Sequence, residues 1–357
     1  MEITAVRSSR LRLLSSAGRT SASVVQLPTE STRSSGFVAL MKPRVMLLAV
    51  FTALVGMLIA PTHLDLLRGA FAIVSIAIGA GAAGVLNMWY DADIDRVMSR
   101  TSMRPIPRGT VSRVEALVFG LVLATGSVAV LTVAANLQAA ALLAFAIFLY
   151  VVVYTIWLKR CTPQNIVIGG AAGALPPAIG WAAATGTISL EPIILFLIVF
   201  LWTPPHFWAL ALNRSAEYAR AGIPMLPVVA GRAATTRQIL IYSILLVPIS
   251  LLPSVLGFAG VIYGVVAVVC GALFVALTWR LHRSMATDRV AANRLFAFSI
   301  FYLFALFAAL LASGGNQPSP PLAARAVLRA TGSATAEFQP HFAQPPGHSK
   351  RISADEA

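Results

Sequence analysis

Residues 69–90 read GAFAIVSIAIGAGAAGVLNMWY, a run of 22 residues without a single Asp, Glu, Lys or Arg. A helix needs about 20 mostly apolar residues to cross the hydrocarbon core of a bilayer, so this run is long enough to span a membrane. Eight further stretches qualify, and the nine predicted spans are residues 40–60, 69–90, 114–135, 137–158, 166–185, 193–212, 239–256, 259–279 and 295–312. The sequence therefore predicts an all-α, polytopic membrane protein.

The composition agrees with a membrane protein. Of the 357 residues, 58% are apolar and only 11% are charged, against about 25% charged in an average soluble domain. This balance excludes a soluble globular enzyme. The excess of 27 Lys and Arg over 13 Asp and Glu lies mainly in the connections between apolar runs, which argues for membrane topology and against nucleic-acid binding. Two cysteines, Cys161 and Cys270, are too few for a disulfide framework.

The basic residues also predict an orientation. If nine helices alternate, 22 of the 27 Lys and Arg fall on one side, Arg68 falls on the other, and four lie in the C-terminal tail. Because basic loops stay on the cytoplasmic side, we expect a cytoplasmic N-terminus and a C-terminus on the opposite side.

We expect three regions along the chain: an arm over residues 1–36, a membrane domain over 37–313 and a tail over 314–357. The arm is rich in Ser and Arg, which is also typical of an organellar transit peptide, but we favour a disordered cytoplasmic arm. The tail holds six prolines and no spanning run, so we expect disorder there too.

Two runs consist only of small residues, at positions 79–84 (GAGAAG) and 169–173 (GGAAG). In membrane helices such runs allow close helix packing. Neither run forms a phosphate-binding loop of the type found in ATPases, so the sequence gives no support for ATP-driven transport.

Three of the eight acids between positions 45 and 313 crowd into one segment, residues 87–95 (NMWYDADID), at the end of the second span. If the helix continues there, Asn87, Asp91 and Asp95 share one face, and Asp93 points elsewhere. Like charges on one helix face repel, so a positive group should lie along this face.

Two kinds of positive group fit the acidic face. The acids could form a structural network with the arginines that follow, which are Arg96, Arg100, Arg104 and Arg108. Alternatively, Asp91 and Asp95 hold Mg²⁺, which takes one or two carboxylates plus phosphate oxygens, and the arginines hold the phosphates. We favour the second interpretation, because ionisable residues at membrane depth are usually functional.

A second polar group lies at the end of the sixth span, in residues 202–208 (WTPPHFW). The double proline removes two backbone donors and should distort the helix, which is tolerated where a helix lines a cavity. His206 is the only histidine well inside a predicted span. It is either a hydrogen-bonded packing residue or, as we favour, a ligand-pocket residue. Asn213 and Glu217 follow at the i, i+4 spacing.

The segment from Asn87 to Asp95, followed by Arg104-Pro105, resembles the first aspartate-rich motif of UbiA-type intramembrane prenyltransferases. A narrower resemblance, to the protoheme IX farnesyltransferases that make heme O, rests on a set of segments in the expected order between about residues 40 and 312. These segments are residues 42–45 (KPRV), 87–95, 100–107 (RTSMRPIP), 154–160 (YTIWLKR), 162–165 (TPQN), 202–210 (WTPPHFWAL) and 217–227 (EYARAGIPMLP).

The resemblance implies a nine-helix bundle around a cavity open to the cytoplasmic side. It implies transfer of farnesyl from farnesyl diphosphate to the 2-vinyl group of protoheme IX (heme b), giving heme O and diphosphate in heme biosynthesis for terminal oxidases. Mg²⁺ is the implied cofactor, and heme b is a substrate. The resemblance further implies a bacterial inner membrane, with a periplasmic C-terminus, and protein partners such as heme A synthase or oxidase assembly proteins.

Site residues follow from the motifs. The implied catalytic residues are Asn87, Asp91, Asp95 and Glu217, with Asp91 and Asp95 as metal ligands. The implied substrate-binding residues are Arg100, Arg104, Lys159, Arg160, Asn165, His206, Asn213 and Tyr218. The chain departs from the superfamily at its second motif, where a pair of aspartates is usual and Asn213 and Glu217 stand here. Whether a second metal binds there stays open.

Two alternatives remain on the sequence alone. A different aromatic acceptor, such as 4-hydroxybenzoate, is possible within the superfamily, but the PPHF segment and the weak second acidic motif argue against it. A membrane transporter would explain charges inside the bundle, but not an acidic helix face that adjoins arginines.

Overall fold

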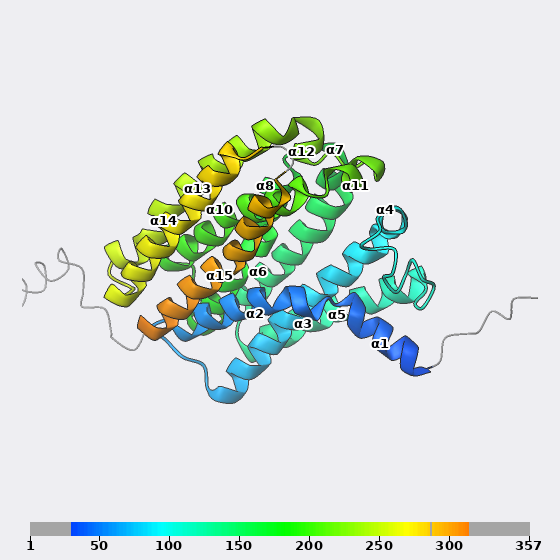
Figure 1. Ribbon diagram of the computed structural model, residues 1–357. Helices are drawn as coiled ribbons and strands as arrows, with labels where there is room; N and C mark the ends of the chain where they lie inside the picture. The colour runs from blue at the N-terminus through cyan, green and yellow to red at the C-terminus, as the bar shows by residue number, and fades with distance from the viewer. Residues whose placement is uncertain (1–29, 286–287, 314–357) are drawn as a thin grey trace, which may run out of the picture.

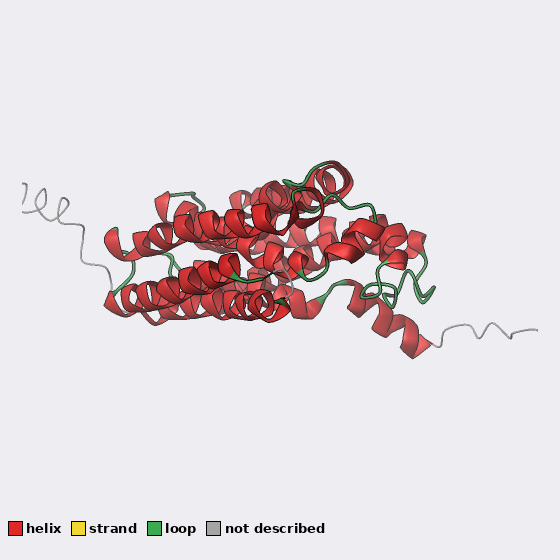
Figure 2. Ribbon diagram, turned by 45° about the horizontal axis from the view of Figure 1, so that its top comes forward, coloured by secondary structure: helices red, strands yellow, loops and turns green. Residues whose placement is uncertain are grey.

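The computed structural model describes residues 30–285 and 288–313, and these residues contain helices and loops but no strand (Figures 1 and 2). The predicted tail and most of the predicted arm lie outside the described residues. Residues 30–36, which we expected to be disordered, belong to the first helix. The helices are α1 (Glu30–Leu40), α2 (Pro43–Leu58), α3 (Leu66–Tyr90), α4 (Ala92–Val97), α5 (Arg113–Ala134), α6 (Leu137–Phe148), the π-helix η1 (Leu149–Leu158), α7 (Lys159–Cys161), α8 (Asn165–Ala174), α9 (Pro176–Thr185), α10 (Leu190–Leu212), α11 (Ser215–Arg220), α12 (Leu226–Val229), α13 (Gly231–Val255), α14 (Val261–Arg283) and α15 (Arg289–Ser313).

Eight helical segments of the described chain are each long and apolar enough to cross a membrane. A ninth span results if the bent pair of residues 34–40 and 43–58 is counted as one. The segments are Leu66–Tyr90, Arg113–Ala134, Leu137–Cys161, Asn165–Thr185, Leu190–Leu212, Gly231–Val255, Val261–Arg283 and Arg289–Ser313. These segments confirm the prediction of an all-α, multi-pass membrane protein.

The first predicted span is not one straight helix. Its two parts meet at an angle of 50°, and Lys42 between them has the left-handed backbone conformation, with φ of 55°. Proline at position 43 begins α2, and a proline disfavours the right-handed helical conformation in the residue before it. The break at Lys42 therefore follows from Pro43.

Small residues let the helices approach closely, as the sequence predicted. A Cβ atom on Gly180 of α9 would lie 1.9 Å from the carbonyl oxygen of Ala53, and one on Gly56 of α2 would lie 2.2 Å from that of Pro177. Helices α2 and α9 are thus in backbone contact. In the two small-residue runs, Gly79 and Gly169 lie against Leu143 and Tyr154 in the same way, which confirms their packing role.

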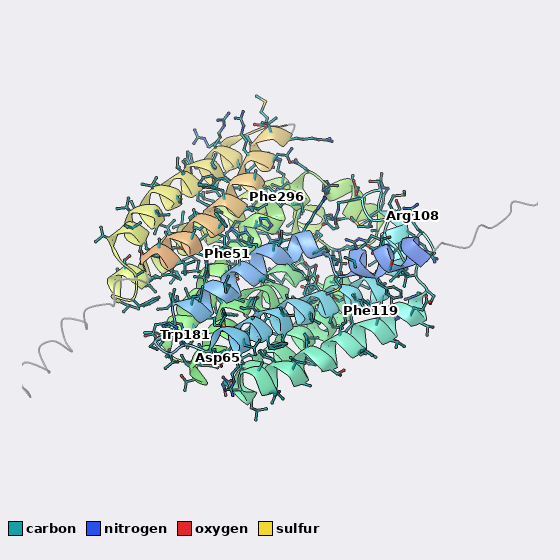
Figure 3. All side chains as sticks on the ribbon, turned by 90° about the horizontal axis from the view of Figure 1, so that it is seen from below. Phe51, Asp65, Arg108, Phe119, Trp181 and Phe296 are labelled. Carbon is teal, nitrogen blue, oxygen red and sulfur yellow. The ribbon has the colours of Figure 1, made fainter. Side chains whose placement is uncertain are left out.

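The short helices α4, α7, α11 and α12 lie toward one end of the bundle (Figure 1). Figure 3 shows Arg108 at this end and Asp65 and Trp181 at the other. We call the end of the bundle that carries the short helices and Arg108 the site end. Helices α3, α10 and α14 finish there, at Tyr90, Leu212 and Arg283.

Candidate active site

The acidic segment lies where α3 ends. Asp91 is the C-cap of α3 and the N-cap of α4, and helical hydrogen bonds cross this junction, from the Asp91 amide to the Asn87 carbonyl (2.9 Å) and from the Asp95 amide to the Asp91 carbonyl (2.8 Å). Asn87, Asp91 and Asp95 are 5%, 0% and 2% exposed, whereas the Asp93 side chain is 57% exposed. The structure thus places Asp93 away from the other three, as the helical spacing predicts.

Each carboxylate has its own basic partner. Lys159 donates to Asp91 Oδ2. Arg104 Nη1 donates to both oxygens of Asp95, at 2.8 and 2.7 Å. These partners come from α7 and from the loop after α4, so the acidic segment is where three parts of the chain meet.

Arg160 holds the exposed acid. Its two terminal nitrogens donate to the two oxygens of Asp93, at 2.9 and 2.8 Å, and its guanidinium lies 4.9 Å from the centre of the Tyr90 ring. These hydrogen bonds lower the pKa of Asp93 to about 2. Arg160 is thereby fixed beside Asp91, with Nη2 at 3.9 Å from Asp91 Oδ1.

Sequence reasoning missed two residues of this site. Lys42 donates from Nζ to Asn87 Oδ1 at 2.7 Å, and Thr155 of η1 accepts from Asn87 Nδ2 at 3.1 Å. Thr155 lies in the π-helix η1, and its hydroxyl donates to the carbonyl of Tyr150, five residues earlier. This hydrogen bond orients the hydroxyl oxygen toward Asn87. π-Helical turns are frequent at functional sites. For Lys42 the signal was a lysine at the start of a predicted span, in the segment 42–45 (KPRV) that we used for the family resemblance but not as a source of site residues.

These contacts fix the amide of Asn87. Its oxygen faces Lys42, while its nitrogen donates to Thr155 and, at 2.7 Å, to Asp91 Oδ2. Asp91 Oδ2 therefore has two donors, whereas Asp91 Oδ1 is buried without a hydrogen-bond partner. A buried, unpaired carboxylate oxygen is costly, and a cation is the group that would satisfy it.

The site carries a net positive charge among the described residues. Four cations gather at three carboxylates: Lys42, Arg104, Lys159 and Arg160 against Asp91, Asp93 and Asp95. Lys42 also lies within electrostatic range of Asp91, Asp95, Lys159 and Arg104. Such an excess suits an anion of several charges, because Arg and Lys bind phosphate oxygens strongly.

Helix α10 carries the second predicted group and contains the double proline. The helix runs from Leu190 to Leu212 with Pro204 and Pro205 inside it, so the double proline does not end or sharply break it. Prolines are tolerated in membrane helices because neighbouring groups take over the freed backbone positions.

His206 is enclosed by aromatic rings. It stacks on Trp202, with ring centres 4.3 Å apart, and on Phe296, at 4.7 Å, and its ring edge meets Phe207. Its Nδ1 atom lies 2.7 Å from the Ser299 hydroxyl. That hydroxyl donates its single proton to the Phe296 carbonyl, at 2.6 Å, so it accepts from His206 Nδ1–H. The lone pair of the neutral imidazole is then on Nε2, the nitrogen available to a ligand.

Asn213 and Glu217 do not share a helix face. Because α10 ends at Leu212 and α11 begins at Ser215, the i, i+4 argument fails there. Asn213 donates to Asn293 Oδ1 at 2.8 Å and to the Arg289 carbonyl at 3.1 Å, which ties α10 to α15. Glu217 lies 3.6 Å from Arg214, and its Oε2 atom is buried without a partner.

The remaining predicted residues differ in their surroundings. Asn165, at the start of α8, is 0% exposed, and neither polar atom of its side chain has a hydrogen-bond partner. Arg100 is exposed. Tyr218 of α11 is half-buried, and both it and Tyr154 of η1 pack against the same hydrophobic cluster.

Residues 49–304 match the UbiA prenyltransferase family. Relatives named protoheme IX farnesyltransferase include one from Methylobacterium nodulans, 58% identical over 290 residues, which are 81% of this chain and 92% of the relative. Another, from Methylobacterium radiotolerans, is 61% identical over 278 residues, 77% of this chain and 88% of the relative.

Solved structures share the fold at low sequence identity. A digeranylgeranylglyceryl phosphate synthase is 19% identical with a TM-score of 0.67, over 79% of this chain and 98% of that one. A UbiA homolog from Archaeoglobus fulgidus, bound to GPP and Mg²⁺, is 19% identical with a TM-score of 0.57, over 77% and 99%. Together with the acidic helix end and its basic partners, these similarities show that the chain is a prenyltransferase of the UbiA family, in the group of the protoheme IX farnesyltransferases.

Proposed function

We propose that this prenyltransferase moves the farnesyl group of farnesyl diphosphate to the 2-vinyl group of heme b, which yields heme O and diphosphate. The observation that carries the diphosphate part is the buried Asp91 carboxylate, with one unpaired oxygen, inside a cluster of four cations. The choice of heme as acceptor is supported by the names of the relatives. Because the chain belongs to a prenyltransferase family, we reject the alternative that it is a membrane transporter.

The donor set at Asp91 fits Mg²⁺. Mg²⁺ is held by one or two carboxylates, with substrate phosphates and water completing the octahedron. No group of three or more His, Cys, Asp or Glu side chains that could hold a metal is found among the described residues, so the protein alone does not provide a closed metal cage. Asp91 through Oδ1, and Asp95, would hold the ion. When bound, Mg²⁺ supplies Lewis-acid neutralisation of the leaving diphosphate.

The chain's own residues bind and orient the donor. Lys159 donates to Asp91, Arg104 donates to Asp95 and Lys42 donates to the Asn87 amide oxygen, so each can pass from its present acceptor to a phosphate oxygen. As the bond to diphosphate breaks, an allylic cation develops, and the aromatic faces of Tyr150 and Tyr154 can stabilise it. The vinyl group then forms a bond to the farnesyl cation, which leaves a carbocation beside the porphyrin ring; water adds to this carbon and loses a proton to the released diphosphate or to solvent, which gives the hydroxyl group. The apolar helix bundle excludes water from the farnesyl cation until the new carbon–carbon bond has formed.

His206 orients the acceptor in this proposal. Its Nε2 lone pair can bind the heme iron, while Ser299 and the rings of Trp202 and Phe296 fix the imidazole. Asn165, Asn213, Glu217, Tyr218 and Arg100 remain proposed substrate residues. Asn165 and Glu217 have unpaired buried polar atoms, which favours their contact with a ligand. The protein partners and a second metal remain predictions.

We further propose a bacterial inner membrane with the site end in the cytoplasm and the C-terminus in the periplasm. The support is the placement of basic residues: Arg68 lies in the first turn of α3 at the far end, whereas Lys42, Lys159 and Arg283 lie at the site end. Basic residues accumulate on the cytoplasmic side.

Expression in a bacterial host that lacks heme O tests the acceptor. Chromatography of the extracted hemes should show a new heme, more hydrophobic than heme b, only when the chain is expressed. Unchanged heme b together with altered quinones would support 4-hydroxybenzoate as the acceptor and would remove the heme proposal.

Replacing Arg104 with Glu should raise the KM for farnesyl diphosphate about 10- to 100-fold, because a charged hydrogen bond to phosphate contributes about 1.5–3 kcal/mol. Initial rates in membranes with equal amounts of chain measure this effect. Arg104→Lys should recover part of the affinity, and Arg96→Glu, an exposed arginine on α4, is the matched control. If Arg104→Glu and Arg96→Glu had the same KM for farnesyl diphosphate, Arg104 would contribute only to the membrane orientation of the chain and not to diphosphate binding.

Replacing Lys42 with Met should lower kcat/KM for farnesyl diphosphate about ten-fold, since it removes one charged hydrogen bond and frees the amide of Asn87. Lys42→Gln, which still has a donor for Asn87 Oδ1, should lie between wild type and Lys42→Met. The exposed neighbour Arg44 provides the control Arg44→Met. Equal activity of Lys42→Met and Arg44→Met would exclude a role of Lys42 in the site.

A further inference from the structure

A groove of about 620 Å³ lies between α13 and α14, far along the chain from the acidic segment. Its lining is apolar and includes Leu240 and Leu251 of α13 and Val268, Ala272 and Trp279 of α14. Ala272 and Trp279 are exposed, so the groove opens toward the surroundings of the bundle. Gly271 lies at its base, where a Cβ atom would come within 3.1 Å of Val247 Cγ2. The missing side chain therefore helps to hollow the surface there.

The groove has the length of one leaflet. On α13 its lining runs from Leu240 to Leu251, and 11 residues of helix correspond to about 16 Å. Half of the hydrocarbon core of a bilayer is about 15 Å. Because Leu240 follows Arg237, the last charged residue of α13, by three positions, the groove begins at the site end of the apolar part of α13 and is long enough for one acyl chain.

Two arginines lie just beyond the groove at the site end, on the same faces of α13 and α14 that line it. Arg237 precedes Leu240 by three residues on α13, and Arg283 follows Trp279 by four on α14, so each lies one helical turn beyond the groove on the same face. Both are exposed, and the Arg283 guanidinium is 5.6 Å from the centre of the Trp279 ring. Among the ion pairs of residues 30–285 and 288–313, none involves Arg237 or Arg283.

We propose that this groove binds an anionic phospholipid of the leaflet at the site end, with one acyl chain along α13 and α14 and the phosphate between Arg237 and Arg283. Two guanidinium groups without acidic partners match the phosphate in charge and in donor geometry. Trp279 lies four residues before Arg283, the last residue of α14, and tryptophan is enriched near the ends of membrane spans. Basic pockets between membrane helices bind the head groups of anionic lipids in this way.

The charges argue against a second copy of the chain as the occupant. A symmetric contact through this face would bring Arg237 and Arg283 of both copies together without a described acid to pair them. Like charges brought out of water in this way destabilise an interface. An anionic lipid instead supplies the missing negative charge.

Native mass spectrometry of the purified full-length chain tests the proposal. The chain is incubated with equimolar phosphatidylglycerol and phosphatidylcholine in detergent, and wild type should retain phosphatidylglycerol preferentially. Because each basic residue near the surface contributes about five-fold to binding of an anionic lipid, Arg237→Gln/Arg283→Gln should lower this retention about 25-fold. The matched control, Arg68→Gln/Arg294→Gln, removes the same charge from two exposed arginines outside the groove and should retain the lipid.

A second variant tests the acyl-chain part. Ala272→Phe fills the groove and should reduce retention of the lipid, whereas Leu273→Phe, on an exposed residue outside the lining, should not. Equal phosphatidylglycerol retention by wild type and the double arginine variant would overturn the proposal. Disulfide-linked dimers of Ala272→Cys in phosphatidylglycerol nanodiscs would also overturn it, because they would show a second copy in the groove.

Discussion

Replacing Asp91 with Asn is expected to lower the kcat/KM of farnesyl transfer at least about a hundred-fold, the loss typical of a group that stabilises charge in a transition state. Asp91 is 0% exposed, and its Oδ1 atom has no hydrogen-bond partner. The change keeps the shape of the side chain and removes its charge, so a metal and the diphosphate lose their central ligand. Turnover per quantity of membrane-inserted chain is the measurement.

Two further variants make this result specific. Asp91→Asn leaves the Lys159 ammonium without its counterion, which could destabilise the fold. Asp91→Asn/Lys159→Met removes this charge as well and should stay inactive while it inserts normally. Asp93→Asn alters an exposed acid that pairs with Arg160 and should retain most activity. Equal activity of Asp91→Asn and Asp93→Asn would refute the metal site.

Replacing His206 with Ala is expected to reduce heme O formation about a hundred-fold while farnesyl diphosphate still binds, because small misplacements of a reacting group cost about this much. The imidazole ring lies between Trp202 and Phe296, and its Nδ1–H group donates a hydrogen bond to the Ser299 hydroxyl. Its loss removes the free Nε2 atom that would face the heme iron. Heme O formation and the Soret band of heme bound to the purified variant are measured together.

Two controls separate ligation from packing. His206→Phe keeps an aromatic ring between Trp202 and Phe296 but has no nitrogen, so it should be as inactive as His206→Ala. Phe207→Ala changes a neighbouring side chain that is 41% exposed and should be nearly as active as wild type. Normal heme spectra and activity in both His206 variants would show that His206 only packs the bundle.

The spans and the acidic face were predictable because both depend on local patterns. A run of about 20 apolar residues suffices to identify a membrane helix. Helical spacing alone separates buried Asp91 and Asp95 from exposed Asp93. The break at Lys42 is also local, since Pro43 causes it, but we extended the first span across it.

Arg104, the partner of Asp95, is close in sequence and was among the arginines named for the acidic face, but the partners that come from distant parts of the chain could not be predicted. Lys42 reaches Asn87 across 45 residues, and Lys159 reaches Asp91 across 68. Ser299 contacts His206 from 93 residues away. The π-helix that brings Thr155 to Asn87 has no signature in the apolar pattern. The i, i+4 argument for Asn213 and Glu217 failed because α10 ends at Leu212, before Asn213, and a new helix, α11, begins at Ser215, between the two residues.

The most direct test of the central claim is a reaction with purified full-length chain, heme b, farnesyl diphosphate and Mg²⁺, followed by mass spectrometry of the extracted hemes and assay of released diphosphate. We predict a heme that carries one hydroxyethylfarnesyl group in place of a vinyl group, formed in equal amount with diphosphate. Release of diphosphate while heme b remains unmodified would contradict the account.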